Sequence, residues 1–364
     1  MQSSRELITN LLTGGPAERV GLCDGPWADT LRAWVEQGYP TDGDGKPIPP
    51  QEHFGYDIWS AGGWFDLAAI PGVREVIEET DEWVVTRNGA GAVFKNWKGK
   101  SGTPEHIDFD MTSRAVWEEK YRPHLLEPDP DRVDTEGARK ALERARENEA
   151  FAIYGHMFIW ECARGSMGDV CLYESMALDP EWIHDYARVY TDFFKAHFNL
   201  LFQEAGMPDG VRLYEDLGYH KGLFCSPQTF ERLIFPYYAE MVEFFHERGL
   251  PVMLHTCGGV EEALPLIVEA GFDCLDPMER KAGNEPLAYA DRYADRLAFM
   301  GGLDARVLES GDRERIEKEV VELIEGMKAR GARYIFHSDH SLSTNVAYDD
   351  YLFALDIYRR HRAY

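Results

Sequence analysis

His255 and Cys257 are the two residues whose types and spacing most directly suggest chemistry. They stand two positions apart at the end of a short apolar run, and the period of a β-strand points both side chains to the same side. Imidazole and thiolate are ligands that zinc prefers. Gly258 and Gly259 let the backbone turn tightly into a helix whose amino end favours a thiolate. The alternative is a packed histidine beside an inert cysteine, because two ligands do not complete a zinc site.

A second polar sequence follows the last apolar run of the chain, at His337-Ser-Asp339-His340. His340 offers a third metal ligand, and Asp339 offers the carboxylate that usually orients a metal-bound imidazole. His337 is expected to face the substrate. The alternative is a loop whose serines and aspartate cap the final helix near Asn345.

Glu215 and Asp216 form an acidic pair at the end of another apolar run. Such a pair can act as a general acid and base, or supply another metal ligand. Acidic residues at strand ends are also common helix caps and ion-pair partners, so both readings stay open. Further polar residues at strand ends are Asp276, Glu279 and Asp304.

Aromatic residues are dense in the segments expected near the same site, and they indicate either an apolar or planar substrate pocket or part of the core. Among them we expect Trp27, Trp160 and Tyr219 to contact the substrate. Lys281 could meet an anionic group of that substrate, or lie solvated on a loop. The other aromatic residues of this set are Tyr56, Trp59, Trp64 and Phe158.

From about Phe151 onward, short β-rich runs alternate regularly with longer helical patterns. These elements would position the residues described above. This alternation is typical of consecutive βαβ units with a parallel sheet. Asp179-Pro180 and Ser226-Pro227 are helix starts, and Pro236 should kink the second helix. The six expected strands are Phe151 to Gly155, Val211 to Glu215, Pro251 to His255, Asp273 to Asp276, Leu297 to Met300 and Arg333 to His337.

Two more strands would close an eight-stranded barrel, and we expect them between Phe54 and Trp97. Within that segment, Trp83 to Arg87 and Ala92 to Trp97 flank Asn88-Gly89 and predict a β-hairpin. The sequence therefore predicts a single α/β domain over residues 1–364. It is a (β/α)8 TIM barrel with an irregular part at 1–150 and regular βα units at 151–364.

Composition excludes several classes of function. The net charge of −26 opposes binding to nucleic acid or to anionic lipid. The first residues lack the apolar stretch of a signal peptide, and no uncharged run reaches the ~18 residues of a membrane helix. Six widely spaced cysteines in a chain of this size are typical of buried thiols. We expect a cytoplasmic protein, and apolar outer helices favour a homodimer.

In combination, several motifs resemble the uroporphyrinogen decarboxylase superfamily, in particular its branch of methyltransferases that serve corrinoid proteins. The resemblance covers about Phe151 to His361 well and the first 150 residues loosely. The motifs that carry it are Tyr214-Glu-Asp-Leu-Gly-Tyr219-His-Lys-Gly222, Leu254-His-Thr-Cys-Gly258, Glu279-Arg-Lys-Ala-Gly283, Phe299-Met-Gly-Gly-Leu-Asp304 and Phe336-His-Ser-Asp-His-Ser341.

Members of that branch hold zinc through such a His-x-Cys motif and a distant cysteine. His255 and Cys257 match the first two ligands, whereas His340 stands where the cysteine would be. The change makes the site less negative, which disfavours activation of a thiol and favours polarisation of an oxygen or nitrogen. The decarboxylase branch binds its tetrapyrrole with paired arginines near the amino end, and Glu18 to Trp27 lacks such a pair.

The resemblance implies a zinc-dependent methyltransferase that moves a methyl group between a small methylated compound and the cobalt of cobalamin on a separate corrinoid protein. His255, Cys257 and His340 would hold the zinc. Glu215 would be a fourth ligand or an acid/base, and Asp339 would orient a histidine. One alternative is a metal-free decarboxylase or lyase that uses Asp216 and His340. Another is a non-catalytic protein that binds a corrinoid or another planar ligand.

Overall fold

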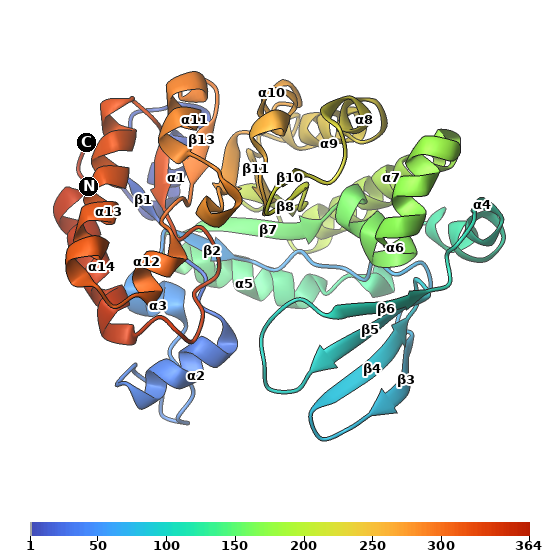
Figure 1. Cartoon of the computed structure of the whole chain (residues 1–364), viewed down its shortest axis with the longest axis horizontal. Coiled ribbons are helices and arrows are strands. Elements are labelled where there is room, and N and C mark those ends of the chain that lie inside the picture. The colour runs from blue at the N-terminus through green and yellow to red at the C-terminus, as the bar shows by residue number, and fades with distance from the viewer. Residues whose placement is uncertain (1) are drawn as a thin grey trace.

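The computed structural model describes residues 2–364 and contains an eight-stranded parallel barrel (Figure 1). Neighbouring strands follow the order β1-β14-β13-β12-β11-β8-β7-β2, and the (β/α)8 prediction is confirmed. The barrel strands are β1 (Gly21–Leu22), β2 (Ile58–Ser60), β7 (Phe151–Met157), β8 (Gly210–Tyr214), β11 (Val252–Thr256), β12 (Cys274–Pro277), β13 (Ala298–Met300) and β14 (Tyr334–Phe336).

Asp57, the residue before β2, joins the first and last strands of this order. Its backbone N–H donates to the Leu22 carbonyl oxygen at 2.7 Å, and its carboxylate accepts the Leu22 N–H at 2.7 Å. Arg19 pairs with the same carboxylate at 2.6 Å. β1 has only two residues and forms few strand-to-strand hydrogen bonds of its own. The side chain of Asp57 therefore helps to connect β1 to β2.

The six strands expected after residue 150 are confirmed, whereas the origin of the remaining two differs from the prediction. One of them, β2, lies in the expected segment, but β1 lies well before it. β1 carries no run of β-branched residues that would mark it. β1 pairs with β14 at Gly21, where an added Cβ would come within 3.1 Å of the Ile335 side chain. The close approach of the two strands therefore favours glycine at this position.

The predicted hairpin belongs to a separate antiparallel sheet beside the barrel. Its order is β3-β4-β5-β6, and β5 and β6 contact α6 (Figure 1). We name this sheet the meander. The loop between β5 and β6 reaches toward α2, where the Ser101 N–H donates to Asp29. The meander strands are β3 (Arg74–Glu79), β4 (Trp83–Asn88), β5 (Ala92–Trp97) and β6 (Glu105–Phe109).

Helices surround the barrel, and the local sequence explains where several of them begin. Asp179 accepts the Trp182 N–H ahead of α7, and Ser226 accepts the Thr229 N–H ahead of α8. The break predicted at Pro236 separates α8 from α9. The helices are α1 (Ser4–Thr13), α2 (Ala28–Glu36), α3 (Pro50–Phe54), α4 (Arg114–Val116), α5 (Thr135–Glu147), α6 (Ile159–Leu178), α7 (Pro180–Glu204), α8 (Pro227–Leu233), α9 (Phe235–His246), α10 (Leu264–Glu269), α11 (Pro286–Tyr293), α12 (Ala305–Glu309), α13 (Arg313–Ala329) and α14 (Tyr348–His361).

Short elements complete the chain. They are the β-ribbon of β9 (Gly218–Tyr219) and β10 (Gly222–Leu223), the π turn η1 (Trp117–Tyr121), and the 3₁₀ turns η2 (Arg122–Leu125), η3 (Pro130–Arg132), η4 (Glu261–Ala263) and η5 (Arg280–Ala282).

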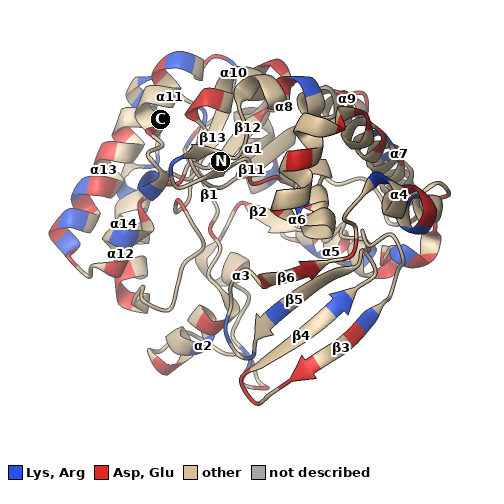
Figure 2. Cartoon of the chain, turned by 45° about the vertical axis from the view of Figure 1, so that its right-hand side comes forward, with Lys and Arg blue, Asp and Glu red and all other residues tan. Residues whose placement is uncertain are grey.

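The core has two layers, as a barrel requires. Side chains such as Ile153, Met253 and Ile335 pack inside the barrel, and a larger apolar layer lies between the strands and the helices. Charged residues gather on the outer helices and the meander (Figure 2). Within residues 2–364, no helix has both the length and the apolar character that a membrane crossing needs.

Candidate metal centre

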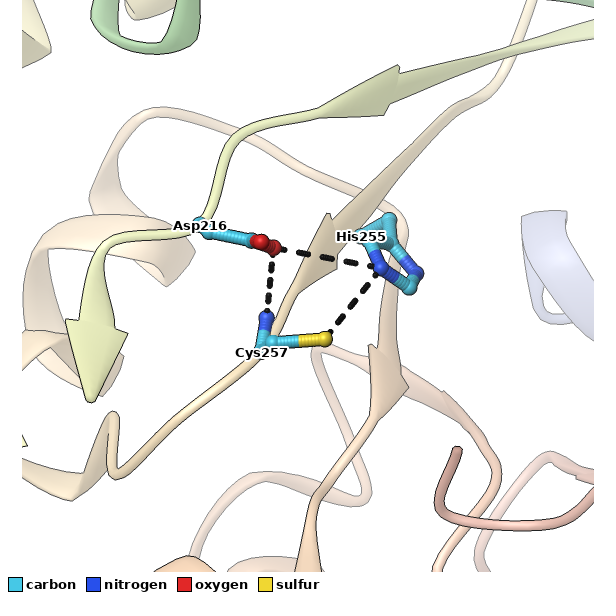
Figure 3. Close-up of side chains that lie close together, drawn as sticks. All are labelled: Asp216, His255 and Cys257. Carbon is cyan, nitrogen blue, oxygen red and sulfur yellow. Dashed lines mark hydrogen bonds and ion pairs between the residues drawn. The ribbon is translucent and has the colours of Figure 1, made fainter. Parts of the chain in front are cut away.

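Three potential metal ligands converge at the carboxyl ends of two neighbouring barrel strands. His255 lies on β11, Cys257 directly follows that strand, and Asp216 follows β8. One ligand atom of each lies within 4.8 Å of the others, and the side chains point toward one another (Figure 3). His255 Nε2 is 3.5 Å from Cys257 Sγ and 3.9 Å from Asp216 Oδ1.

These distances fit the donors of a tetrahedral zinc ion. Zinc–nitrogen and zinc–sulfur bonds of about 2.1 and 2.3 Å put two such donors about 3.6 Å apart. The Nε2 to Sγ separation matches that value, and Asp216 needs only a small side-chain movement. Three protein ligands with one open position are the usual arrangement of a catalytic zinc site.

Asp276 on β12 orients His255. The strand register places the two residues side by side, and Asp276 Oδ1 accepts a hydrogen bond from His255 Nδ1 at 2.7 Å. Arg212 Nη2 also lies 3.1 Å from Nδ1, but the carboxylate is the shorter contact and only accepts, so it favours the proton on Nδ1 and leaves the Nε2 lone pair facing Cys257 and Asp216. Burial raises the pKa of Asp276, but Arg212 and His255 lower it by more, to about 2.

Cys257 needs a cation to become a thiolate. Burial raises the pKa of its thiol well above the usual range, and the carboxylates of Asp216 and Glu279 raise it further. A bound divalent cation reverses this effect because it stabilises the negative sulfur. Gly258 then turns the chain at φ 81°, where an added Cβ would lie 2.1 Å from the Gly218 carbonyl carbon.

The three donors line a cavity of about 730 Å³ at the carboxyl ends of the strands. Its walls include Tyr214 and Pro277 from the barrel strands and the segment after β1. Its roof comes from outside the barrel, because residues 101–104 of the loop between β5 and β6 line it as well. We name this space the metal cavity.

Trp27, His337 and His340 lie where the sequence places them, on the wall of the metal cavity. The edge of the His340 ring meets Trp27 at 5.7 Å between centroids, and His340 Nδ1 lies 3.3 Å from the Ser341 carbonyl oxygen. His340 is not among the donors that converge, so Asp216 takes the position expected for it as third ligand. His337 is buried and lies 3.9 Å from Asp24.

Glu215 is not a ligand, which corrects the expectation for it. Neighbouring residues at a strand end point to opposite sides, so Glu215 turns away from Asp216 and into the start of α6. Its carboxylate accepts the backbone N–H groups of Phe158, Trp160 and Glu161 at 2.7, 2.8 and 3.2 Å. Burial raises the pKa of Glu215 to about 8. It is a helix cap that connects β8 to α6.

Asp339 does not orient a histidine, which is a second correction. Its two oxygens accept the backbone N–H groups of Arg280 and Ala305 at 2.7 and 2.8 Å. The side chain is buried and connects the loops that follow β12, β13 and β14. Asp276 has the orienting role that the sequence assigned to Asp339.

Trp160, Tyr219 and Lys281 do not line the metal cavity. Trp160 is fully buried, and its indole N–H donates to the Asp216 carbonyl oxygen at 2.8 Å. It therefore positions the backbone of Asp216 and is not a substrate contact. Tyr219 lies on the β-ribbon with 42% of its surface exposed. Lys281 pairs with Glu279 at 2.8 Å.

Sequence reasoning missed the roles of three residues near the site. They are Arg212, which binds Asp276, Asp276 as the residue that orients His255, and Glu161, which lines a neighbouring cavity. Asp276 had a signal, because it stands at a strand end next to the strand of His255. Arg212 is a single charge within an apolar strand, where its guanidinium binds Asp276 at 2.7 and 2.8 Å. Glu161 lies in the first turn of α6, and only the fold brings it near the barrel opening.

A solved structure is similar to this protein in its fold. A methyltransferase from Methanosarcina mazei is structurally similar, with a TM-score of 0.67 and 14% identity over 99% of each chain. A chitinase from Chromobacterium violaceum ATCC 12472 aligns with a TM-score of only 0.44 and 9% identity, over 94% of this chain and 99% of that chain. No curated protein sequence matches significantly.

The model of the family described as uroporphyrinogen decarboxylase (URO-D) matches residues 163–361, which is more than half of the chain. That region contains β8, β11 and β12, and with them Asp216, His255, Cys257 and Asp276. The chain therefore belongs to the uroporphyrinogen decarboxylase family.

Proposed function

We propose that this protein is a zinc-dependent methyltransferase that moves a methyl group between a small methylated compound and the cobalt of a separate corrinoid protein. The observation that carries the proposal is the convergence of Asp216, His255 and Cys257 beside a cavity of about 730 Å³. Similarity to the Methanosarcina methyltransferase supports the same class of fold. The zinc ion and the corrinoid partner are part of what we propose.

The chain's own residues prepare the site for this transfer. Asp276 holds the Nδ1 proton of His255, so Nε2 keeps its lone pair for the metal. Trp160 and the Cys257 N–H fix Asp216 from two sides, at 2.8 and 2.9 Å. When bound, zinc supplies a Lewis acid that stabilises negative charge on the atom that loses or gains the methyl group. Loss of the methyl group leaves the electron pair of the broken bond on that atom.

A metal-free decarboxylase that uses Asp216 and His340 is less well supported. Recognition of an acid usually needs an arginine or lysine with free donors. Among the described residues, Arg212 is the one arginine or lysine on the metal cavity, and Asp276 binds its Nε and Nη2 at 2.8 and 2.7 Å. A cavity that also presents Asp24 and Asp216 is poorly suited to a carboxylate.

Metal content tests the proposal. Purified wild-type protein should contain about one equivalent of zinc, because a site of this kind is nearly filled. Cys257→Ser and His255→Ala should each lose most of that zinc, and Asp216→Asn should weaken its retention. Ser341→Ala is the matched control, since Ser341 lines the same cavity without belonging to the donor group.

Methyl transfer is then followed by the visible spectrum of free cob(I)alamin, which is replaced by that of methylcobalamin when a methylated donor is consumed. Wild-type activity should be lost with a chelator and in Cys257→Ser. The proposal is wrong if wild type and His255→Ala alike retain less than about a tenth of an equivalent of zinc. Turnover of a small acid that survives Cys257→Ser and chelation would establish the decarboxylase instead.

A further inference from the structure

A second cavity of about 500 Å³ adjoins the metal cavity. It lies between the meander and the start of α6, and its lining is mainly apolar, with rings from Trp64, Phe94 and Tyr190. Thr103 and Pro104 line both cavities, so the β5–β6 loop is a shared wall. We name this space the second cavity.

Aromatic rings connect the second cavity to the metal centre. Tyr214 lines the metal cavity, with its ring centroid 5.2 Å from that of His255. The same ring lies 5.7 Å from Trp64, which lines the second cavity. A compound in the second cavity therefore lies two aromatic rings, Trp64 and Tyr214, away from His255.

Glu161 gives the second cavity a carboxylate oxygen without a partner. Its Oε1 accepts from Arg164 at 2.7 Å, whereas its Oε2 makes no hydrogen bond within residues 2–364. Arg164 does not line the cavity, and its guanidinium also binds Asp169 at 2.8 Å. Burial raises the pKa of Glu161 to about 7, although Arg164 lowers it. A cation in the cavity would offset the cost of burying this charge.

The second cavity offers no lysine or arginine to an anionic ligand. Within the described part of the chain neither residue type lines it, and the one arginine of the metal cavity, Arg212, binds Asp276 through Nε and Nη2. The carboxylates of Asp66 and Glu161 line the second cavity, and those of Asp24 and Asp216 line the metal cavity. With a net charge of −26, the protein attracts cations and repels anions.

We infer that the second cavity binds the non-reacting part of the methylated substrate, and that this substrate is an apolar compound with a cationic nitrogen and no acid group. Trp64 and its neighbouring rings receive the apolar part, and a cation over an aromatic face gains further attraction. Glu161 Oε2 receives the positive charge. The inference rests on the proposed function and deepens it, because it names the class of substrate.

Three probes that share a benzyl group test the inference by calorimetric titration of the zinc-loaded protein. They are benzyltrimethylammonium, neutral benzyl methyl ether and anionic phenylacetate. The cation should bind at least ten times more tightly than either of the others. Glu161→Gln should reduce this advantage several-fold and leave affinity for the ether unchanged. Glu143→Gln is the control, because Glu143 is exposed on α5 and lines neither cavity.

A filling variant tests the location. Val73 lines the second cavity and is 41% exposed, so Val73→Trp can occupy the space without disturbing the core. It should weaken binding of the cation at least tenfold and keep the zinc content of wild type. Thermal unfolding of each variant checks that it is folded.

Two results would overturn the inference. One is binding of phenylacetate or the ether as tight as that of the cation, and the other is unchanged affinity for the cation in folded Glu161→Gln and Val73→Trp. Zinc analysis separates this failure from that of the proposed function. Full zinc occupancy without preference for the cation refutes only the inference. Preference for the cation in a protein that binds no zinc refutes the proposed function and leaves the second cavity as a cation site.

Discussion

His255 keeps one ring nitrogen available for a metal because Asp276 fixes the proton on the other. The same carboxylate is bound by Arg212 on β8, the strand on the other side of β11, so its charge is balanced inside the barrel. The orientation of the imidazole thus depends on a buried ion pair. The carboxylate of Asp276 therefore affects both the orientation of His255 and the stability of the barrel.

Replacement of Asp276 by asparagine should therefore weaken zinc binding. The variant keeps the shape of the side chain but removes the charge that orients the imidazole, so affinity for zinc should fall about 10- to 100-fold. Competition with a chromophoric chelator measures it. Asp44→Asn, on an exposed loop, should behave as wild type. Wild-type affinity in folded Asp276→Asn would show that Asp276 does not position His255.

His156 provides a second prediction at the scale of one residue, and it concerns pH. The buried ring accepts from the Phe65 N–H at 3.1 Å and lies 3.0 Å from the Met157 carbonyl oxygen, as a neutral imidazole does. Burial lowers its pKa from 6.5 to about 3. Below pH 6.5 the imidazole of His156 is protonated in the unfolded chain but stays neutral in the folded protein. Stability is therefore complete above that pH and falls as pH decreases toward 3.

Between pH 7 and pH 5 this group should remove about 2 kcal/mol from the free energy of unfolding. Denaturant titrations at the two pH values should show this as a change of about 2 kcal/mol in the difference between wild type and His156→Gln, because the raised pKa values of Glu161 and Glu215 act on both proteins alike and with the opposite sign. Exposed His124→Gln is the control and should keep the full pH dependence. The same pH dependence in all three proteins would contradict this account.

At the scale of elements, the turn after β11 determines where Cys257 lies. Gly258 has φ 81° and contacts the backbone of Gly218 in the loop after β8. Its N–H donates to Glu279 beyond β12 at 2.8 Å. Loops from three adjacent strands therefore meet at one glycine, and they hold the sulfur next to His255.

Gly258→Ala should disrupt this meeting point, because its methyl group would lie 2.1 Å from the Gly218 carbonyl carbon. We expect a loss of more than about 2 kcal/mol in the free energy of unfolding, together with reduced zinc content. Gly249→Ala is the matched control. Gly249 has φ 71° with nothing within 4 Å, so it should lose only about 1 kcal/mol and keep its zinc. Equal effects of the two variants would contradict the steric argument.

Elements with strong local patterns could be predicted from the sequence, and those set by neighbours could not. The six barrel strands after residue 150 are mostly apolar runs covered on both faces, and that pattern is visible in the sequence. β1 has two residues and depends on Asp57 and Ile335, which are distant in sequence. The period of two correctly paired His255 with Cys257. Spacing after β14 could not place His340, because the backbone of an irregular loop sets where a side chain points.

At the scale of the whole molecule, the barrel closes between β1 and β2 at one buried residue, Asp57, through its backbone N–H and its carboxylate. Asp57 binds Leu22 and Arg19 directly before the amino end of β2, whereas the zinc donors lie at the carboxyl ends of β8 and β11. In barrels of this kind the amino ends serve stability, and the carboxyl ends serve chemistry. The two ends should therefore respond separately to mutation.

Asp57→Asn should cost about 3–5 kcal/mol, because it leaves Arg19 without its partner in a half-buried place. Denaturant unfolding measures this cost. Zinc per folded molecule should stay at the wild-type value, since the donors lie at the other end of the barrel. Glu136→Gln, which breaks an exposed pair with Lys140, should change stability by less than about 1 kcal/mol. Loss of zinc from folded Asp57→Asn would refute the independence of the two ends.

Residues 101–104 contribute to the metal cavity although they belong to the meander and to no barrel strand. The roof of the cavity and the three converging donors therefore lie in different stretches of the sequence. A library randomised at Ser101, Gly102 and Thr103 would vary what the enzyme accepts while Asp216, His255 and Cys257 stay constant. The meander is thus a natural starting point for redirecting the barrel to new compounds.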